Sequence, residues 1–256
     1  MHNRISHILL FTILLFVIGA PVASATPDNG ELVFFMPDTD WPPYMTAQDP
    51  GEPKGVLVEI LEEAIRPLGY TLIIRTLPDR RGWVQLENGD VDAHAKAKEW
   101  VDDPERFLWT VPFIESEDTL ITAAGEKFEY DSPANLKGMR VAVIGSFAYP
   151  ALAPYFADGS VTRINVSDPY RMLDLVEKGR ADAAVVNKRE TEWLFKTRQD
   201  LSANRFTIHE KPIDSAWYRF AFTRANGWQP HIKRLNMELE AMIQDGRLDA
   251  ILQRYK

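Results

Sequence analysis

The chain has 256 residues, no cysteine, and 37 acidic against 29 basic side chains. The missing cysteine excludes a disulfide frame and a thiol for lipid attachment. The acidic balance, without any basic block, argues against a general nucleic-acid binder, because such proteins need clustered Lys and Arg to displace counterions from phosphate. The sequence also lacks a glycine-rich phosphate loop, a His-Glu-x-x-His pair and clustered Cys/His ligands, so we expect no cofactor and no metal.

The N-terminus has the pattern of a secretory signal peptide. Its apolar run, ILLFTILLFVIGAPVA, is short for a membrane span and is followed by Ala23-Ser24-Ala25. We predict that residues 1–25 are cleaved and that the exported chain begins at Thr26; an uncleaved N-terminal anchor is the alternative. With 45% hydrophobic residues, the exported chain has enough apolar surface for one large domain or two small ones.

The first exported segments predict a β-α-β unit. A buried strand at 31–36 (ELVFFM) precedes an amphipathic helix at 54–68, and a second strand follows at 70–76. The prolines of PDTDWPPYM prevent the first strand from continuing, so Trp41 and Tyr44 would lie at its C-terminal end, where α/β sheets collect ligands. The alternative is that both rings cap the core beneath the loop. A short helix at 80–88 should then end at Gly89.

The segment DAHAKAKEWVDDPERFLWTVPF, at 92–113, contains a candidate anion-binding residue. Arg106 offers a planar fork of donors that matches a carboxylate. Aromatic residues lie close to Arg106 on both sides in the sequence. Their rings would exclude water from an ion pair between Arg106 and a carboxylate. The alternative is an ordinary solvated arginine.

An internal echo suggests that one unit is built twice. LENGDVDA at 86–93 returns as VEKGRADA at 176–183, and each copy would end a helix at Gly and start a strand after Asp. Around the second copy the predicted order is again β-α-β-α-β, including a helix from Ala148 to Phe156. Chance similarity at a common turn is the alternative. We therefore expect two α/β lobes, to which a strand at 217–223 and a helix at 231–243 are added.

These segments together resemble a known family. DWPPYM at 40–45, DPERFLWTVPF at 103–113, NLKGMRVAVIGS at 135–146, VEKGRADAAVV at 176–186 and MIQDGRLDAILQRY at 242–255 are similar, in order and spacing, to the bacterial extracellular solute-binding proteins of family 3, the amino-acid-binding type. The resemblance implies two Rossmann-like lobes joined by two hinge strands, with the ligand in the cleft between them. Lobe 1 would comprise 27–116 plus 217–256, and lobe 2 would comprise 117–216.

The resemblance also implies site residues. In the family, the arginine of this turn holds the ligand's carboxylate, which corresponds to Arg106, and the loop aromatics correspond to Trp41 and Tyr44. A helix N-terminus in lobe 2, suited to an anionic group, corresponds to Ser146 and Phe147.

This sequence departs from the family pattern at two places. Asn187 stands where the family usually has an aspartate for the ligand's ammonium, and a neutral amide supplies no counter-charge. The run AKAKEWVDD replaces a Gly/Ser/Thr-rich stretch, and its Lys96 and Lys98 suggest an extra anionic group on the ligand. Solvated surface lysines are the alternative. Glu99, in the same run, is a further candidate for the cleft.

The resemblance implies a non-enzymatic periplasmic protein that captures a small polar, carboxylate-bearing solute. We expect a monomer that delivers this solute to an inner-membrane ABC-type permease. The alternative is an exported enzyme similar to cyclohexadienyl dehydratases, for which Glu99, Asp38 or Asp40 would be the general acid unless they are ordinary loop carboxylates. A receptor's sensor lobe is less favoured, because no second hydrophobic span follows in the sequence.

Overall fold

A computed structural model describes the protein at residues 30–46 and 54–255, so the predicted signal peptide lies outside the described residues. The described residues form one mixed sheet with the strand order β2-β1-β3-β9-β5-β8-β6-β7, and β4 pairs with β9. The strands are β1 (Glu31–Pro37), β2 (Thr71–Leu77), β3 (Ala93–Ala97), β4 (Leu108–Trp109), β5 (Ile114–Ala123), β6 (Arg140–Ile144), β7 (Thr162–Val166), β8 (Ala183–Asn187) and β9 (Phe206–Phe222).

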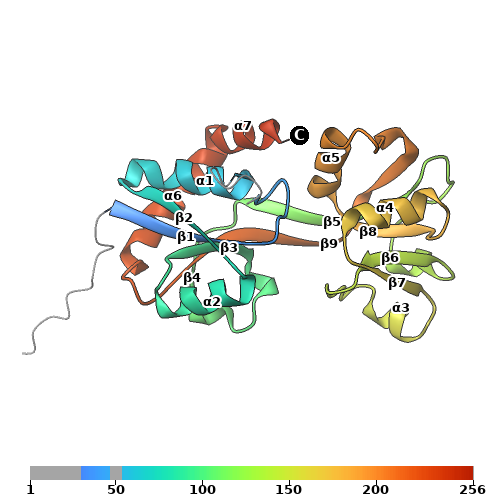
Figure 1. Cartoon of the computed structure of the whole chain (residues 1–256), viewed down its shortest axis with the longest axis horizontal. Helices are drawn as coiled ribbons and strands as arrows, with labels where there is room; N and C mark the ends of the chain where they lie inside the picture. The colour runs from blue at the N-terminus through green and yellow to red at the C-terminus, as the bar shows by residue number, and fades with distance from the viewer. Residues whose placement is uncertain (1–29, 47–53, 256) are drawn as a thin grey trace, which may run out of the picture.

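Helices cover this sheet in two separate groups (Figure 1). The α-helices are α1 (Val56–Ile65), α2 (Asp79–Asn88), α3 (Ala153–Ala157), α4 (Pro169–Glu177), α5 (Lys188–Thr197), α6 (Gln229–Gln244) and α7 (Arg247–Arg254). Short 3-10 turns are η2 (Arg66–Leu68), η3 (Lys98–Trp100), η4 (Pro104–Arg106), η5 (Pro133–Leu136) and η6 (Ala203–Arg205). Lobe 1, on the left in Figure 1, contains α1, α2, α6 and α7, and lobe 2, on the right, contains α3, α4 and α5.

Two long antiparallel strands, β5 and β9, run through both lobes (Figure 1). Their pairing extends from Ile114 opposite Tyr218 to Ala123 opposite Phe206, and its register shifts on both sides of Thr119. Within each lobe the neighbouring strands pair in parallel, as β1 with β2 and β6 with β7. The fold is thus the predicted α/β architecture of two lobes joined by two hinge strands.

The buried apolar side chains fall into separate cores for the two lobes. Two clusters draw their buried residues from 32–114 and 218–251, and two others from 120–206. Each lobe therefore has a hydrophobic core of its own, and no shared core joins the two lobes among the described residues. The lobe boundaries at residues 116/117 and 216/217 stay a prediction, because β5 and β9 cross them without a break.

The internal echo is confirmed as a repeated helix-turn-strand unit. Helices α2 and α4 are each followed by a glycine with positive φ, Gly89 at 82° and Gly179 at 63°, a conformation that costs glycine little. In the first copy the Asp92 carboxylate accepts the backbone N–H of Val33 at 2.8 Å; in the second, the Asp182 carboxylate accepts that of Arg140 at 2.7 Å. Both aspartates thereby fix the start of a neighbouring strand.

The predicted helix from Ala148 to Phe156 is wrong in its start. Residues 145–152 form turns and α3 begins at Ala153, so Ser146 and Phe147 do not occupy a helix N-terminus. Pro150 lacks the N–H that a helix interior needs and disfavours helical geometry in the residue before it, which explains the late start. Phe147 is instead exposed, with 53% of its surface accessible.

Candidate functional site

Four aromatic rings of lobe 1 gather where the two lobes meet. This ring cluster consists of Trp41 and Tyr44 from the loop after β1, Trp100 from η3 and Tyr218 from β9. Centroid distances within it run from 5.0 Å, between Trp41 and Tyr44, to 6.3 Å, between Trp41 and Trp100. Tyr44 and Tyr218 are fully buried, whereas Trp100 keeps 41% of its surface exposed, so the cluster has an accessible side.

The loop after β1 is held in place by backbone pairing. Trp41 and Met45 exchange two backbone hydrogen bonds, of 2.8 and 2.9 Å, and α1 begins by donating the Leu57 N–H to the Tyr44 carbonyl at 3.1 Å. A Cβ at Gly55 would lie 2.3 Å from the Tyr44 carbonyl oxygen, so this contact requires glycine. The close approach of loop and helix fixes the direction of the Trp41 and Tyr44 rings.

A polar wall from lobe 2 faces these rings. Asn187 ends β8 and caps α5, since its side-chain oxygen accepts the Glu190 N–H at 3.1 Å. The same oxygen accepts the Tyr44 hydroxyl at 3.1 Å, and the amide nitrogen donates to Ser116 Oγ at 2.9 Å. The Asn187 side chain therefore connects both lobes and the hinge strand β5.

Two carboxyl groups lie beside this contact in unfavourable surroundings. Burial raises the pKa of Glu190 to about 8; the hydrogen bond from Trp41 opposes this shift and the charge of Asp118 adds to it. Burial likewise raises the pKa of Asp118 to about 6, with Asn187 opposing and Asp214 adding. Glu190 is thus mostly protonated at neutral pH, while Asp118 is mostly ionised.

Several other polar groups in the same place lack partners among the described residues. The fully buried Tyr218 hydroxyl has no hydrogen-bond partner, and neither do Nε and Nη1 of Arg189. Arg189 acts on the Tyr44 hydroxyl by charge and by a hydrogen bond, which lowers a Tyr44 pKa that burial otherwise raises. Buried polar atoms left unsatisfied are costly, and they are a feature of sites that complete their hydrogen bonds with a ligand.

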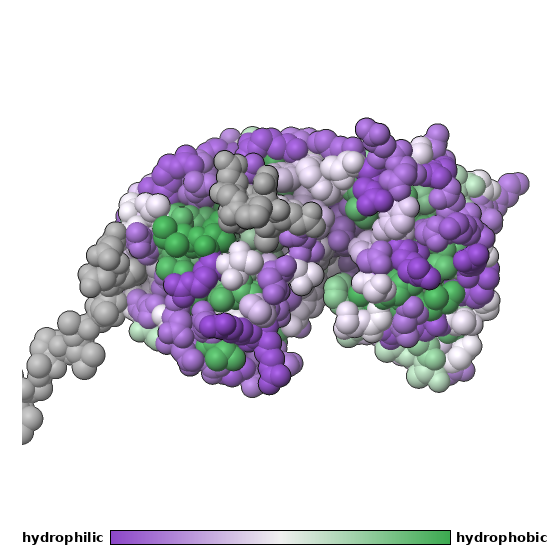
Figure 2. All heavy atoms as spheres, in the orientation of Figure 1, coloured by the Kyte–Doolittle hydropathy of each residue, from purple (hydrophilic) through white to green (hydrophobic). Residues whose placement is uncertain are grey.

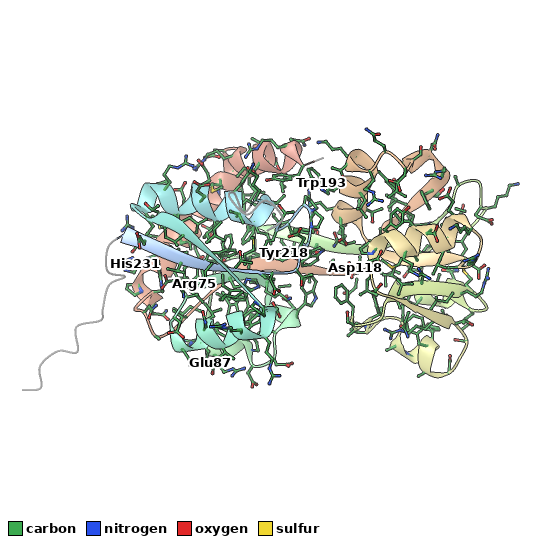
Figure 3. All side chains as sticks on the ribbon, viewed as in Figure 1. Arg75, Glu87, Asp118, Trp193, Tyr218 and His231 are labelled. Carbon is green, nitrogen blue, oxygen red and sulfur yellow. The ribbon has the colours of Figure 1, made fainter. Side chains whose placement is uncertain are left out.

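The surface and side-chain views locate this constellation in a cleft. Figure 2 shows a cleft between the two lobes that opens at the lower edge of the view. In Figure 3, Tyr218 and Asp118 lie at the junction of the lobes, along β9 and β5. A separate groove of about 710 Å³ lies between α1 and α7, but charged side chains that pair with one another, such as Arg247 and Glu63, dominate it.

The chain matches a known protein family over most of its length. The model of the bacterial extracellular solute-binding proteins, family 3, matches residues 34–256. The chain belongs to this family. It is therefore a solute-binding protein, and the family consists mostly of non-enzymatic binding proteins.

Solved structures share the family 3 fold at low identity. The second substrate-binding domain of GlnP from Lactococcus lactis, in an open conformation, has a TM-score of 0.70 and 20% identity over 91% of this chain and 97% of that one. An ancestral arginine-binding protein bound to arginine has a TM-score of 0.63 and 19% identity over 88% and 98%. A histidine kinase sensor domain has the same TM-score of 0.63 and 19% identity over 88% and 95%. The search among curated protein sequences found no match.

The structure of this family 3 protein brings only some of the predicted residues together. Trp41, Tyr44 and Asn187 meet in the cleft, as described above. Arg106 is exposed on η4 and forms an ion pair of 2.9 Å with Glu87 of α2. Glu87 lies at the lower edge of lobe 1 in Figure 3, away from Tyr218.

The remaining predicted residues have various surroundings. Lys98 pairs with the exposed Glu105 at 2.8 Å, and Glu99 is exposed. Lys96 is half-buried in β3, opposite Arg219 in the register with β9. Ser146 and Phe147 lie in exposed turns of lobe 2.

Sequence reasoning missed the acidic part of the cleft. Glu190 stands in VVNKRE, three residues after Asn187, and this spacing places it on the first turn of the helix that Asn187 caps. Asp118 carried no comparable signal, because its position depends on the pairing of β5 with β8 and β9.

Residues 30–46 and 54–255 include no helix that combines the length and the apolarity of a membrane span. They also include no group of three or more His, Cys, Asp or Glu side chains that could hold a metal ion.

Proposed function

We propose that this protein captures a small polar solute between its lobes in the periplasm and presents the closed form to an ABC-type importer. The observation that carries the proposal is the hydrogen bond of 3.1 Å from the Tyr44 hydroxyl of lobe 1 to Asn187 of lobe 2, amid unsatisfied polar groups. Two-lobed binding proteins close around ligands by bending at a few hinge residues. The irregular register around Thr119, in β5, supplies such a position beside the cleft.

We further propose that the solute carries a carboxylate, and two arginines compete for it. The family resemblance supports Arg106, as does the fork of donors that every arginine offers. Its ion pair with Glu87 weighs against that role. Two buried, unpartnered nitrogens beside Tyr44 support Arg189.

The test combines a ligand screen with scattering. A thermal-shift screen over amino acids, small dicarboxylates, amines and aromatic acids should find a solute that raises the apparent stability, because it binds the native state alone. Small-angle scattering should then show a smaller radius of gyration with that solute. The Trp193→Ala variant is measured as well, because it removes the ring contact of Trp193 in α5 with Tyr255 after α7 and should be more open without ligand. If the solute compacts neither the wild type nor this variant, the proposal is wrong.

One observation favours the dehydratase alternative. Glu190, with its pKa raised to about 8, has the poised acid form that elimination of water would need in the cleft. Incubation with prephenate and arogenate should reveal an aromatic product if this reaction occurs, and Glu190→Gln should abolish it. Absence of product at high enzyme concentration leaves the binding function standing.

A further inference from the structure

We infer that lobe 1 contains a site for a doubly charged anion, such as a phosphate, a sulfate or a dicarboxylate, formed by Lys96 of β3 and Arg219 of β9. The site lies on the face of the sheet opposite the ring cluster and does not involve Arg106. The inference goes beyond the proposed function, because it holds whether the anion is free or is one end of the captured solute.

The strand register places the two cationic side chains side by side. Lys96 is directly opposite Arg219 in the antiparallel pairing of β3 with β9, and the next pair is Ala97 with Tyr218. Residues in such opposite positions share a face of the sheet, with Cβ atoms about 4.5–5.5 Å apart. Successive residues of a strand alternate between faces, and Tyr218 belongs to the ring cluster. Lys96 and Arg219 therefore occupy the other face together.

Two like charges in this arrangement are unfavourable without an anion. Like charges directly opposite each other in a sheet are destabilising. Both side chains are half-buried, so solvent and salt screen their repulsion only in part. None of the ion pairs found among the described residues includes Lys96 or Arg219. An anion bound to both groups would replace one repulsion with two attractions.

The guanidinium of Arg219 is an independent observation. Its Nε is buried and has no hydrogen-bond partner among the described residues, and its Nη1 reaches the Thr110 carbonyl oxygen only at 3.5 Å. Buried donors without a partner are rare because they are costly. The planar fork of a guanidinium matches two oxygens of a phosphate, sulfate or carboxylate. The unused donors of Arg219 therefore favour a ligand with several anionic oxygens.

The neighbouring titratable groups do not compensate this positive charge. Burial, together with the charge of Lys96, lowers the pKa of His94 on the same face of β3 to about 3, so this ring is neutral at pH 7. Glu115 of β5 is opposite Trp217, two residues before Arg219, and it forms no ion pair of 4 Å or less with either cation. Trp217 keeps 42% of its surface exposed, so solvent reaches this side of the strand.

Calorimetry on the exported chain at pH 7.5 and constant ionic strength tests the site directly. The probes are inorganic phosphate, sulfate and succinate, and acetate is the singly charged control. We expect at least one dianion to bind about tenfold or more tightly than acetate, because only a dianion can neutralise both cations. If none of the three dianions binds more tightly than acetate, the inference is wrong.

Two variants assign the binding to the two cations. Lys96→Met and Arg219→Met keep much of the apolar stem and remove the charge, so each should weaken the dianion about tenfold or more. Arg180→Met is the control, because it removes an exposed arginine of lobe 2, and it should change the affinity less than twofold. Wild-type dianion affinity in both variants overturns the inference.

Melting temperatures separate a binding role from a merely structural one. In chloride buffer, Lys96→Met should melt at a higher temperature than the wild type, since it removes the repulsion from Arg219. The dianion should then stabilise the wild type more than Lys96→Met, because it binds the native wild type more tightly. Arg180→Met corrects for the general effect of the salt. Equal stabilisation of all three proteins, or a lower melting temperature of Lys96→Met in both buffers, overturns the inference.

Scattering distinguishes the two sources of the anion. A dianion that binds and also lowers the radius of gyration is one end of the captured solute, whereas binding without compaction identifies a separate anion; both results retain the site. If the dianions fail while another solute binds and compacts the protein, this inference is wrong and solute capture stands. If a dianion binds at Lys96 and Arg219 while no solute compacts the protein, the site stands and the proposed function is wrong.

Discussion

At the residue scale, two largely buried carboxyl groups determine how the cleft responds to pH. Glu190 and Asp118 share surroundings that disfavour two negative charges, and the hydrogen bonds of Trp41 and Asn187 offset this in part. The ligand-free protein therefore keeps a proton on Glu190 at neutral pH. Loss of this proton as the pH rises should lower the free energy of unfolding.

The first prediction concerns stability. Because the pKa of Glu190 is raised on folding to about 8, the folded state binds the extra proton between about pH 5 and 8, and its stability falls as the pH rises through that range. Glu190→Gln cannot ionise, so it should be more stable than wild type at pH 9, by on the order of 4 kcal/mol, and nearly equal at pH 5. Denaturant melts of the ligand-free protein at both pH values measure this. Parallel pH profiles for the two proteins would contradict it, and Glu192→Gln should follow the wild type.

The second prediction separates the two arginines. Arg106→Ala should leave the affinity for the identified solute within about twofold, because an exposed pair such as Arg106–Glu87 contributes about 0–1 kcal/mol and faces away from the rings. Arg189→Ala should weaken binding at least tenfold if the solute has an anionic end. Calorimetry on both variants, with circular dichroism to verify folding, tests this. A loss of about 2–5 kcal/mol for Arg106→Ala would instead support the family-based assignment.

At the element scale, helix ends and repeated turns could be predicted from the sequence because their causes are local. Gly89 ends α2 and Gly179 follows α4 because both need positive φ, and Asp92 and Asp182 recur with them. Helix α3 starts five residues later than the predicted Ala148, because Pro150 disfavours a helix at and before its own position. The acidic part of the cleft was not predicted for another reason: strand pairing places Asp118 opposite Asn187, and no local pattern encodes that pairing.

The third prediction concerns two helices that touch across the lobes. Trp193 of α5 packs on Tyr255, just after α7, with ring centroids 5.6 Å apart, and Figure 3 places Trp193 at the top of the gap between the lobes. Trp193→Ala removes this contact and should shift the ligand-free protein toward a larger radius of gyration and a several-fold weaker affinity. Scattering and calorimetry measure both effects. Met237→Ala, at an exposed position of α6, is the control; equal effects of the two substitutions would rule out a specific contact.

At the scale of the whole molecule, export is the expectation that the sequence carries by itself. The fourth prediction is that N-terminal sequencing of the exported protein begins at Thr26, because Ala23-Ser24-Ala25 precedes it as a cleavage site. A form that retains residues 1–25 and sediments with membranes would contradict this. The two-lobed fold could be predicted from the order of segments, whereas the distribution of charge inside the cleft required the packed structure.

The pairing of β5 with β9 also brings together the two points where the chain passes between the predicted lobes. Ser116 and Ala216, at the predicted lobe boundaries, are opposite each other in the antiparallel ladder, so their Cα atoms lie about 5 Å apart. A short turn could therefore join the two cut ends without distorting lobe 1. For the same reason, a lobe 2 from another family member could be exchanged as one cassette, which would combine the ring cluster of this protein with a different polar wall.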